Sequence, residues 1–552
     1  MTPTVLILGG GVAGMSAAHE LVERGYRVTV LEKRDVPGGK ARSLLVPDSA
    51  VPPNAPLPGE HGFRFFPHFY RHIIDTMART PVGGGRTAVD NLVYANRELL
   101  GRFGYPPITF PAHAPRTMRE LAEMLRLMFT NEHTGLTEDD MLFFADRLWR
   151  LMTACPARSL EEYENESWWA FMDADHRSAA FRHYFVEGLT RCLVAAKAKV
   201  ANVRAGGVVL TQLVYGSMAS APSFDRLLNG PTTEVWIHPW RDYLAARGVE
   251  FRFATEVAAI ECDGRRITGV RTRPGGGAVE GALTADHYIC ALPIEYTAPL
   301  LTKEILAADP ALAGILRIAG QVYDMTGIQF YLEQDVPLVK GHMSMIDTPW
   351  ALTGISQRQF WPGIDFAHLG DGRVNGILSI DISEWDTPGL CFPGPDGKNK
   401  TARQCTKDEV AEDVWTQMRK SLTQPDGGCP LPERRPRFFI DPGMVFDPTP
   451  VRNENKLFVN EVGSWKYRPE AHTAIPNFAL AADYVRTFTN LATMEAANEA
   501  ARRAVNAILD ADGSAAPRCE IWPLYRPPEL WPLIQLDKLI WAIERAKRSL
   551  FG

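Results

Sequence analysis

Three glycines close to the amino terminus, Gly9, Gly11 and Gly14, constrain the fold of this chain more than any other feature. They directly follow the apolar run 4–8, which predicts a buried strand, and they precede a helix that we expect to begin near Val12. In such a turn, the first glycine permits a tight bend, the second lets a phosphate approach, and the third lets helix and strand pack closely. Phosphates would lie at the helix amino terminus. The spacing therefore predicts a dinucleotide-binding βαβ unit.

A second predicted strand, residues 27–31, supports this interpretation because it ends in an acidic residue. Glu32 lies eighteen residues after Gly14, where a carboxylate can accept hydrogen bonds from a ribose. An ordinary glycine-rich turn does not explain this acid. The same carboxylate disfavours a 2′-phosphate, so NADP is not expected.

The composition limits what else the chain can be. Its 552 residues, 45% of them hydrophobic, can build more than one domain, and the net charge of −6 gives no basic field for nucleic acid. No uncharged apolar run reaches the roughly 18 residues of a spanning helix. We also expect no cleavable signal before the first strand. The eight cysteines form no CxxC pair. We therefore expect free thiols, no metal, and a cytoplasmic protein that could still associate with a membrane.

A second glycine turn follows the acid at residues 37–43, with the sequence PGGKARS. A nicotinamide-binding fold does not need this turn, which is close enough to fold back onto a pyrophosphate. It resembles the GGR or GGK signature of the flavin amine oxidase and phytoene desaturase superfamily. The segment 60–66, EHGFRFF, is similar to the superfamily segment that runs beside the isoalloxazine ring.

A matching piece lies near the carboxyl terminus. Residues 477–484, NFALAADY, read as an apolar strand ending in an aspartate, and residues 491–495, LATME, open an alanine-rich helix to Leu509. These segments resemble the superfamily's LAGD and TMEGA motifs. The resemblance implies that Asp483 bonds the ribityl and pyrophosphate region, and that the Met494 amide faces the pyrimidine end of the flavin. A helix amino terminus favours the negative charge that a reduced flavin develops there.

The resemblance implies FAD as the cofactor, bound without a metal. The implied FAD-binding residues are Gly9, Gly11, Ala13, Gly14, Glu32, Lys33, Gly39, Lys40, Ala41, Arg42, Gly62, Phe63, Arg64, Val257, Asp483 and Met494. Val257 is included because residues 255–260 are similar to the strand whose valine amide meets the adenine. The chain departs from the pattern at Ala482 and Ala496, where the family has glycine. It departs again at Lys40, which replaces an arginine and lacks its bidentate grip.

The expected fold class is α/β, with a discontinuous, Rossmann-like FAD-binding domain of the GR2 type, a mixed α+β substrate domain and a helical insertion. The expected boundaries are 1–115, 230–295 and 446–510 for the FAD domain, 116–229 for the insertion, 296–445 for the substrate domain and 511–552 for an amphipathic tail.

The substrate-binding parts contain few obvious polar groups. The insertion reads helical, with Thr137 and Asp140 as a capping box, and residues 296–445 combine strands such as 326–332 with a helix at 407–422. The aromatic and apolar runs in these segments could also simply pack in a hydrophobic core. Because residues 296–445 offer little to orient a sugar or a charged amine, we expect an extended apolar ligand.

The tail carries Trp522, Trp531 and Trp541, then a helix from about Leu533. One face holds Leu533, Leu536, Ile540 and Ile543, and the cations around it are Lys538, Arg545, Lys547 and Arg548. Such a helix can lie on an anionic membrane. It can equally dock on its own protein.

Among superfamily members the chain is most similar to plant and cyanobacterial type phytoene and ζ-carotene desaturases and relatives that act on squalene-type lipids. These transfer hydride from an allylic C–H bond to flavin N5 and pass electrons to quinone or dioxygen. An amine oxidase, a redox-neutral polyene isomerase or dehydroxylase, and a membrane-surface flavoprotein without enzymatic activity stay open as alternatives. The resemblance puts His61 and Arg64 near the flavin, where either could stabilise charge or shuttle a proton, or form only a salt bridge. Trp465 or Tyr467 could lie beside the substrate.

Overall fold

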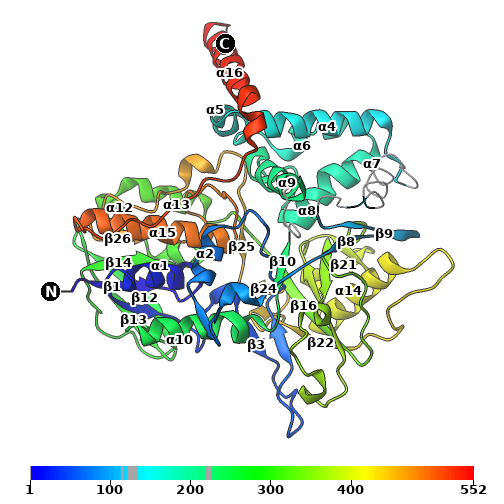
Figure 1. The fold of residues 1–552 in the computed structure, drawn as a ribbon, viewed down its shortest axis with the longest axis horizontal. Coiled ribbons are helices and arrows are strands. Elements are labelled where there is room, and N and C mark those ends of the chain that lie inside the picture. Colours follow the sequence, from blue (N-terminus) through cyan, green and yellow to red (C-terminus); the bar gives the residue numbers. More distant parts are fainter. Residues whose placement is uncertain are drawn as a thin grey trace.

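The glycine-rich turn lies at the centre of a parallel sheet with strand order β11-β2-β1-β14-β26 (Figure 1). The computed structural model describes residues 2–113, 117, 120, 134–194, 196–218 and 225–551. The strands of this sheet are β1 (Thr4–Leu8), β2 (Arg27–Leu31), β11 (Glu250–Arg252), β14 (His287–Cys290) and β26 (Phe478–Leu480). The predicted α/β class is confirmed, and β1 and β2 have the predicted bounds.

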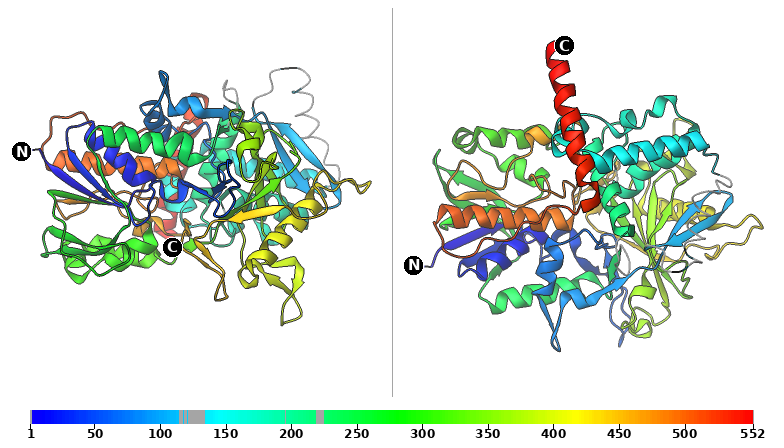
Figure 2. Two further views of the ribbon diagram at one scale, coloured as in Figure 1. Left: turned by 90° about the horizontal axis from the view of Figure 1, so that it is seen from below. Right: turned by 45° about the horizontal axis from the view of Figure 1, so that its top comes forward.

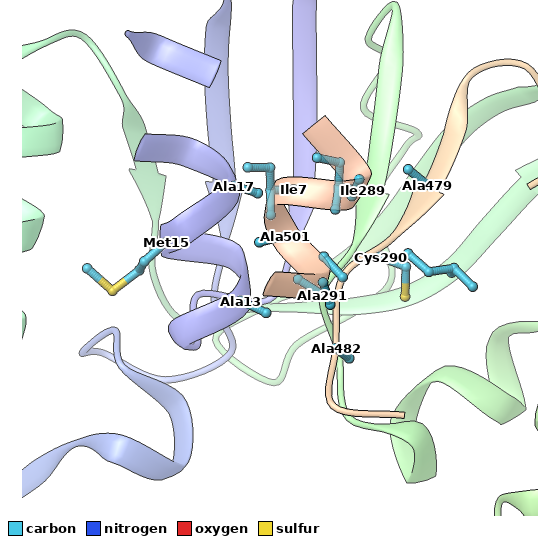
Figure 3. Close-up of a cluster of buried hydrophobic side chains, with 14 of the residues drawn as sticks. Ile7, Ala13, Met15, Ala17, Ile289, Cys290, Ala291, Ala479, Ala482 and Ala501 are labelled. Carbon is cyan, nitrogen blue, oxygen red and sulfur yellow. The ribbon is translucent and has the colours of Figure 1, made fainter. Parts of the chain in front are cut away.

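Small side chains hold two helices against this sheet. Helix α1 (Val12–Val22) packs on α15 (Met494–Ala511), so segments that are far apart in the sequence meet. Figure 3 shows Ala17 of α1 and Ala501 of α15 beside Ile7 of β1, and both alanines are fully buried. Because alanine adds only a methyl group, the two helices can approach closely over the sheet.

A seven-stranded mixed sheet forms the second part, with strand order β22-β16-β19-β18-β17-β8-β9. Its strands are β8 (Arg97–Arg102), β9 (Tyr105–Pro111), β16 (Thr326–Leu332), β17 (Met343–Met345), β18 (Leu352–Ser356), β19 (Gly376–Ile382) and β22 (Arg437–Ile440), and α14 (Lys407–Leu422) packs against it with its predicted bounds.

Strands β8 and β9 correct one expected boundary. Residues up to 115 were expected in the FAD-binding domain, but β8 pairs in parallel with β17, and Leu99 packs with Met343 and Ile328 in the core of the seven-stranded sheet. Leu99 of β8 is therefore buried in the second part. The amino-terminal segment contributes to both sheets.

The remaining elements are short or helical. The other paired strands are β3 (Ser43–Leu45) with β4 (Pro58–Glu60), β5 (Pro81–Gly83) with β6 (Arg86–Thr87), β7 (Leu92–Tyr94) with β10 (Arg226–Leu228), β12 (Thr255–Cys262) with β13 (Ile267–Pro274), β15 (Val322–Tyr323) with β25 (Leu457–Phe458), β20 (Pro388–Pro393) with β21 (Asn399–Thr401), and β23 (Met444–Val445) with β24 (Arg452–Asn453). The other helices of the two sheet-containing parts are α2 (His72–Ala78), α10 (His238–Ala246), α11 (Ile294–Thr297), α12 (Lys303–Ala308) and α13 (Ala313–Ile318).

The insertion is largely helical over its described residues. It contains α4 (Glu138–Thr153), α5 (Pro156–Arg158), α6 (Trp168–Phe171), α7 (Ala179–Phe181), α8 (Leu189–Val194) and α9 (Val203–Met218). The capping box at α4 is confirmed: Asp140 N–H donates to Thr137 Oγ1 at 3.1 Å, and Thr137 N–H donates to Asp140 Oδ2 at 3.1 Å.

The tail ends in α16 (Trp531–Phe551), which begins against the insertion and projects from the body (Figures 1 and 2). Ile534 and Trp541 are buried beside Tyr215, and Arg158 Nε donates to Asp537 Oδ1 at 2.9 Å. The predicted apolar face is divided, because Leu533 packs on the body while the side chains farther along are exposed. Among the described residues, no helix combines the length and apolarity needed to cross a bilayer.

Candidate active site

A cavity of about 1070 Å³ runs from the glycine turns to the seven-stranded sheet and the insertion. Its lining includes Gly9 and Met494 at one end and Leu213 and Ile346 at the other. The cavity therefore joins both sheet-containing parts and the helical insertion.

Two glycine turns form one wall of the cavity, backbone against backbone. Gly38 N–H donates to Gly10 O at 2.8 Å, and a Cβ on Gly39 would lie only 3.0 Å from Gly11 Cα. A Cβ on Gly14 would lie 1.9 Å from Gly9 O, so the predicted packing role of Gly14 is confirmed. Without side chains, the turns and the amino terminus of α1 leave room and amide donors for a pyrophosphate, which fits FAD.

Glu32 lies at the far end of this cradle, at the carboxyl end of β2. It is 5% exposed, and its carboxylate accepts hydrogen bonds from Gly10 N–H and Arg34 N–H, both at 2.9 Å. Lys33 and Val257 line the cavity beside it. This group suits the ribose and adenine of a dinucleotide, as the sequence spacing indicates.

Arg64 connects the second glycine turn to the segment that follows β4. Its guanidinium donates to Gly62 O at 2.6 Å, to Phe63 O at 3.1 Å and to Lys40 O. Lys40 donates in turn to Lys456 O. Arg64 lines the cavity and also fixes the backbone around it.

His61 and Arg42 meet at a buried carboxylate. His61 Nδ1 and Arg42 Nη2 each lie 3.4 Å from Asp441 Oδ2. Burial would raise the pKa of Asp441, but the two neighbouring side chains hold that pKa below its usual range, with His61 contributing most. Burial lowers the pKa of His61, against the opposing effect of Asp441. Burial thus favours the neutral form of the His61 imidazole, which lines the cavity.

Gly62 and Gly327 allow the segment 61–63 to cross the seven-stranded sheet. A Cβ on Gly327 would lie 2.5 Å from Gly62 Cα, and a Cβ on Gly62 would lie 2.7 Å from Asp381 Oδ1. Asp381 lies in β19 and lines the cavity. Burial raises its pKa to about 7, with Arg64 opposing the shift. A carboxyl group that titrates near neutral pH thus lies beneath Gly62.

The carboxyl-terminal motif closes the cavity from the other side. Thr493 caps α15 by accepting from Ala496 N–H at 3.1 Å, and Met494 at the helix start lines the cavity. Ala482 also lines it, whereas the fully buried Ala496 is not among its lining residues. Of the two alanines that replace glycine, Ala482 is therefore the one whose Cβ faces the cofactor region.

Asp483 lines the cavity from a turn, not from a strand. The predicted strand 477–484 is wrong in length, because β26 ends at Leu480. The buried Arg468 side chain explains the turn: it donates to Asp483 O at 3.1 Å and also to the two following carbonyls, those of Tyr484 and Val485. The sequence carries no recognisable signal for this role of Arg468.

Glu495 is a second residue whose role was not foreseen. Its carboxylate accepts from the amides of Arg71, His72 and Ile73 at 2.8 to 3.0 Å, so it caps α2. The sequence did contain a signal for Glu495, because this residue is part of the TMEGA-like motif.

The predicted site residues that line the cavity are Gly9, Gly11, Ala13, Glu32, Lys33, Gly39, Lys40, Ala41, His61, Gly62, Phe63, Arg64, Val257, Asp483 and Met494. Arg42 does not line it, because its guanidinium is engaged with Gly39 O at 2.7 Å and with Asp441. Trp465 and Tyr467 are also not among the lining residues, and Trp465 instead faces the Arg204 guanidinium at 3.8 Å.

The expectation that the substrate end offers few polar groups is wrong. That end is mostly apolar, but Glu98, Asp225 and His342 line it as well. The expectation considered residues 296–445, whereas Glu98 and Asp225 reach the cavity from β8 and from the residue before β10.

Comparison with known proteins places this geometry among flavoproteins. The family model of flavin containing amine oxidoreductases matches residues 12–509. A D-amino acid dehydrogenase of Methylobacterium nodulans is 28% identical over 310 residues, a match that spans 54% of this chain and 62% of that protein. The neurosporene-forming phytoene desaturase of Cereibacter sphaeroides is 49% identical over 39 residues, 7% of this chain and 8% of that protein. A solved structure of putrescine oxidase with bound putrescine has the same fold, with a TM-score of 0.59 at 12% identity, over 92% of this chain and 99% of that one.

Proposed function

Because the chain belongs to the flavin containing amine oxidoreductase family and is an FAD-dependent oxidoreductase, we propose that it dehydrogenates an apolar lipid of the isoprenoid or polyene type. The observation that carries this proposal is the apolar wall at the substrate end of the cavity. It consists of Leu99, Leu100, Phe110, Leu189, Val209, Leu210, Leu213, Val214 and Ile346. At about 25 cal/mol per Å² of buried apolar surface, such a wall binds a long hydrocarbon without charged contacts.

The residues of the chain have separate tasks in this reaction. The two glycine turns and Glu32 would hold FAD, which when bound supplies the acceptor for electrons and hydride. Arg64 fixes the backbone on both sides of the cofactor region, and Phe63 begins the apolar wall. Burial favours the neutral imidazole of His61, and His61 lines the cavity, so it can accept a proton there. Quinone or dioxygen would reoxidise the enzyme.

We also propose that the protein takes its lipid from an anionic membrane. Leu536, Leu539, Ile540 and Ile543 of α16 are 42 to 65% exposed, and Trp149 of the adjacent α4 is 50% exposed. Lys538, Lys547 and Arg548 are exposed on the same helix. The insertion that contains α4 also contains α9, which lines the cavity. Apolar side chains and cations together favour an interface with anionic lipid.

Oxidation of an amine is the second candidate. The carboxyl groups of Glu98 and Asp225 in the cavity favour it, because an ammonium group needs such partners. The apolar wall weighs against a small amine, since most of the chamber would be left without contacts.

Anaerobic mixing of the FAD-loaded protein with phytoene, squalene, putrescine or benzylamine tests the choice. We expect an isoprenoid to bleach the flavin absorption and to yield a product two hydrogens lighter, with both amines inert. Bleaching by an amine with the lipids inert would replace the proposal with the second candidate. A product of unchanged mass would indicate an isomerase.

A further inference from the structure

Three ionisable side chains meet at the substrate end of the cavity. Glu98 lies in β8, Asp225 directly precedes β10, and His342 directly precedes β17; all three line the cavity. The His342 ring meets the edges of Phe63 and Phe65 at centroid distances of 5.7 and 4.9 Å. The cluster is therefore adjacent to the segment that begins the apolar wall.

The backbone around this cluster is fixed by hydrogen bonds. Leu99 N–H donates to His342 O at 2.9 Å, and Ala95 N–H donates to Asp225 O at 3.1 Å. A Cβ on Gly341 would lie 1.6 Å from Arg97 O, so only glycine lets this segment approach β8 so closely. The close approach brings His342 Nδ1 to 3.8 Å from Glu98 Oε2. These backbone contacts fix the cluster as part of the cavity wall.

The cluster is buried, and Glu98 has unused hydrogen-bonding capacity. Glu98 and Asp225 are each 7% exposed, and Glu98 Oε1 has no hydrogen-bond partner among the described residues. The guanidinium of Arg226, which follows Asp225, donates to Phe66 O at 3.2 Å and to Pro67 O at 3.4 Å. Its hydrogen bonds thus go to main-chain carbonyls and not to the carboxyl groups.

Burial sets the protonation state of the three groups. It raises the pKa of Glu98 well above its usual range, with Asp225 adding to the shift, and raises the pKa of Asp225 to about 7. Burial lowers the pKa of His342 to about 4. Burial therefore favours the protonated form of both carboxyl groups, and His342 is a neutral imidazole at neutral pH.

We propose that Glu98, with Asp225 and His342, forms a neutral hydrogen-bonding subsite for a hydroxyl or carbonyl oxygen of an otherwise apolar substrate. The inference rests on the proposed function and narrows its substrate class from hydrocarbons to oxygenated isoprenoids. A protonated carboxyl can donate to such an oxygen, and the imidazole can donate or accept. A pure hydrocarbon would bury the same groups without partners, which weakens its binding. An ammonium group would require ionised carboxylates, contrary to the state that burial favours.

Equilibrium binding to the FAD-loaded, full-length protein tests this without requiring turnover. The probes are farnesol, the matched hydrocarbon farnesene and the matched amine farnesylamine, and the readout is the perturbation of the flavin absorption spectrum under anaerobic conditions. We expect farnesol to bind roughly tenfold more tightly than farnesene and farnesylamine. The Glu98→Gln variant should keep this preference because it still donates and accepts, whereas Glu98→Leu should abolish it.

The controls separate this subsite from the proposed function. Glu280→Leu, at an exposed position outside the cavity lining, should bind like the unaltered protein. Equal binding of farnesol and farnesene overturns the subsite but leaves an apolar lipid as substrate. If the protein prefers farnesylamine and Glu98→Gln abolishes that preference, an ion pair with the amine replaces the proposed subsite. If no isoprenoid binds, the proposed function fails together with the subsite. Because the three probes are compared on the unaltered protein, the test remains decisive even if a variant does not fold.

Discussion

At the scale of single residues, Glu32 links the glycine turn to the cavity. Its carboxylate accepts from Gly10 N–H while lining the cavity. We predict that Glu32→Ala weakens FAD binding by about 1.5 to 3 kcal/mol, the value of a hydrogen bond to a charged group. Glu32→Gln, which retains an acceptor, should lose less. Titration of apoprotein with FAD, followed by flavin fluorescence, measures both. Equal affinity in all three proteins would show that the carboxylate does not contact FAD.

Asp381 makes folding stability depend on pH. Because burial raises its pKa to about 7 from 3.8, its contribution to stability is complete below about pH 4 and is lost as the pH rises through 7. Asp381→Asn should therefore gain stability relative to the unaltered apoprotein as the pH rises from 4 to 8, by up to about 4 kcal/mol. Denaturant unfolding at several pH values measures the difference. A stability difference for Asp381→Asn that does not change with pH would refute the prediction.

Residue roles were predictable where a motif fixes the spacing. Gly9, Gly11 and Glu32 fall into their places because one strand, one turn and one helix position them locally. Glu98 and Asp225 were not predictable, since they meet only after β8 joins β17 and β10 joins β7. Such pairings between distant segments have no local signal.

At the scale of elements, α16 has one face that packs on the body and one face that is exposed. Ile534 and Trp541 dock on the body, while Leu539 and Ile543 are exposed. We predict that the double variant Leu539→Asp and Ile543→Asp remains folded but loses binding to anionic liposomes in co-sedimentation, because its apolar contact is replaced by repulsion.

Three controls define this experiment. Leu316→Asp, at a 45% exposed position on α13, should bind as the unaltered protein does. Binding should weaken with salt, since the cations contribute through screened attraction. Deletion of residues 520–552 should also release the protein. Undiminished binding of the double variant would show that this face is not a membrane contact.

Elements with strong periodicity or caps were predicted accurately, such as α14 and β16. The length of β26 was not, because Arg468 draws the carbonyls after Leu480 into a turn. The tail helix was predicted, but the face that docks was not, because docking depends on Arg158 and Tyr215 of the insertion.

At the scale of the whole molecule, the cavity lining joins all the major parts of the chain, so cofactor binding and folding should be linked. Gly11, Val257 and Asp483 all line it although they lie in separate segments. We predict that FAD at a hundred times its dissociation constant stabilises the protein by about 2.7 kcal/mol. Thermal unfolding at increasing FAD concentrations measures this. A melting temperature that ignores FAD would contradict the assignment of the cavity.

The family resemblance gave the discontinuous plan of the FAD-binding unit, which local patterns alone do not reveal. The predicted domain boundary at residue 115 is wrong because nothing in the sequences of β8 and β9 indicates which sheet they join.

The contact between α1 and α15 has a consequence for biosynthesis. The sheet receives β1 first and β26 last, and the wall that contains Met494 exists only after nearly the whole chain has been translated. A ribosome-bound chain must therefore carry an incomplete cradle for most of its synthesis, with the alanines of α1 that pack in the core uncovered until α15 emerges. Flavin incorporation becomes a late event, and chains arrested before α15 are expected to remain colourless and to depend on chaperones.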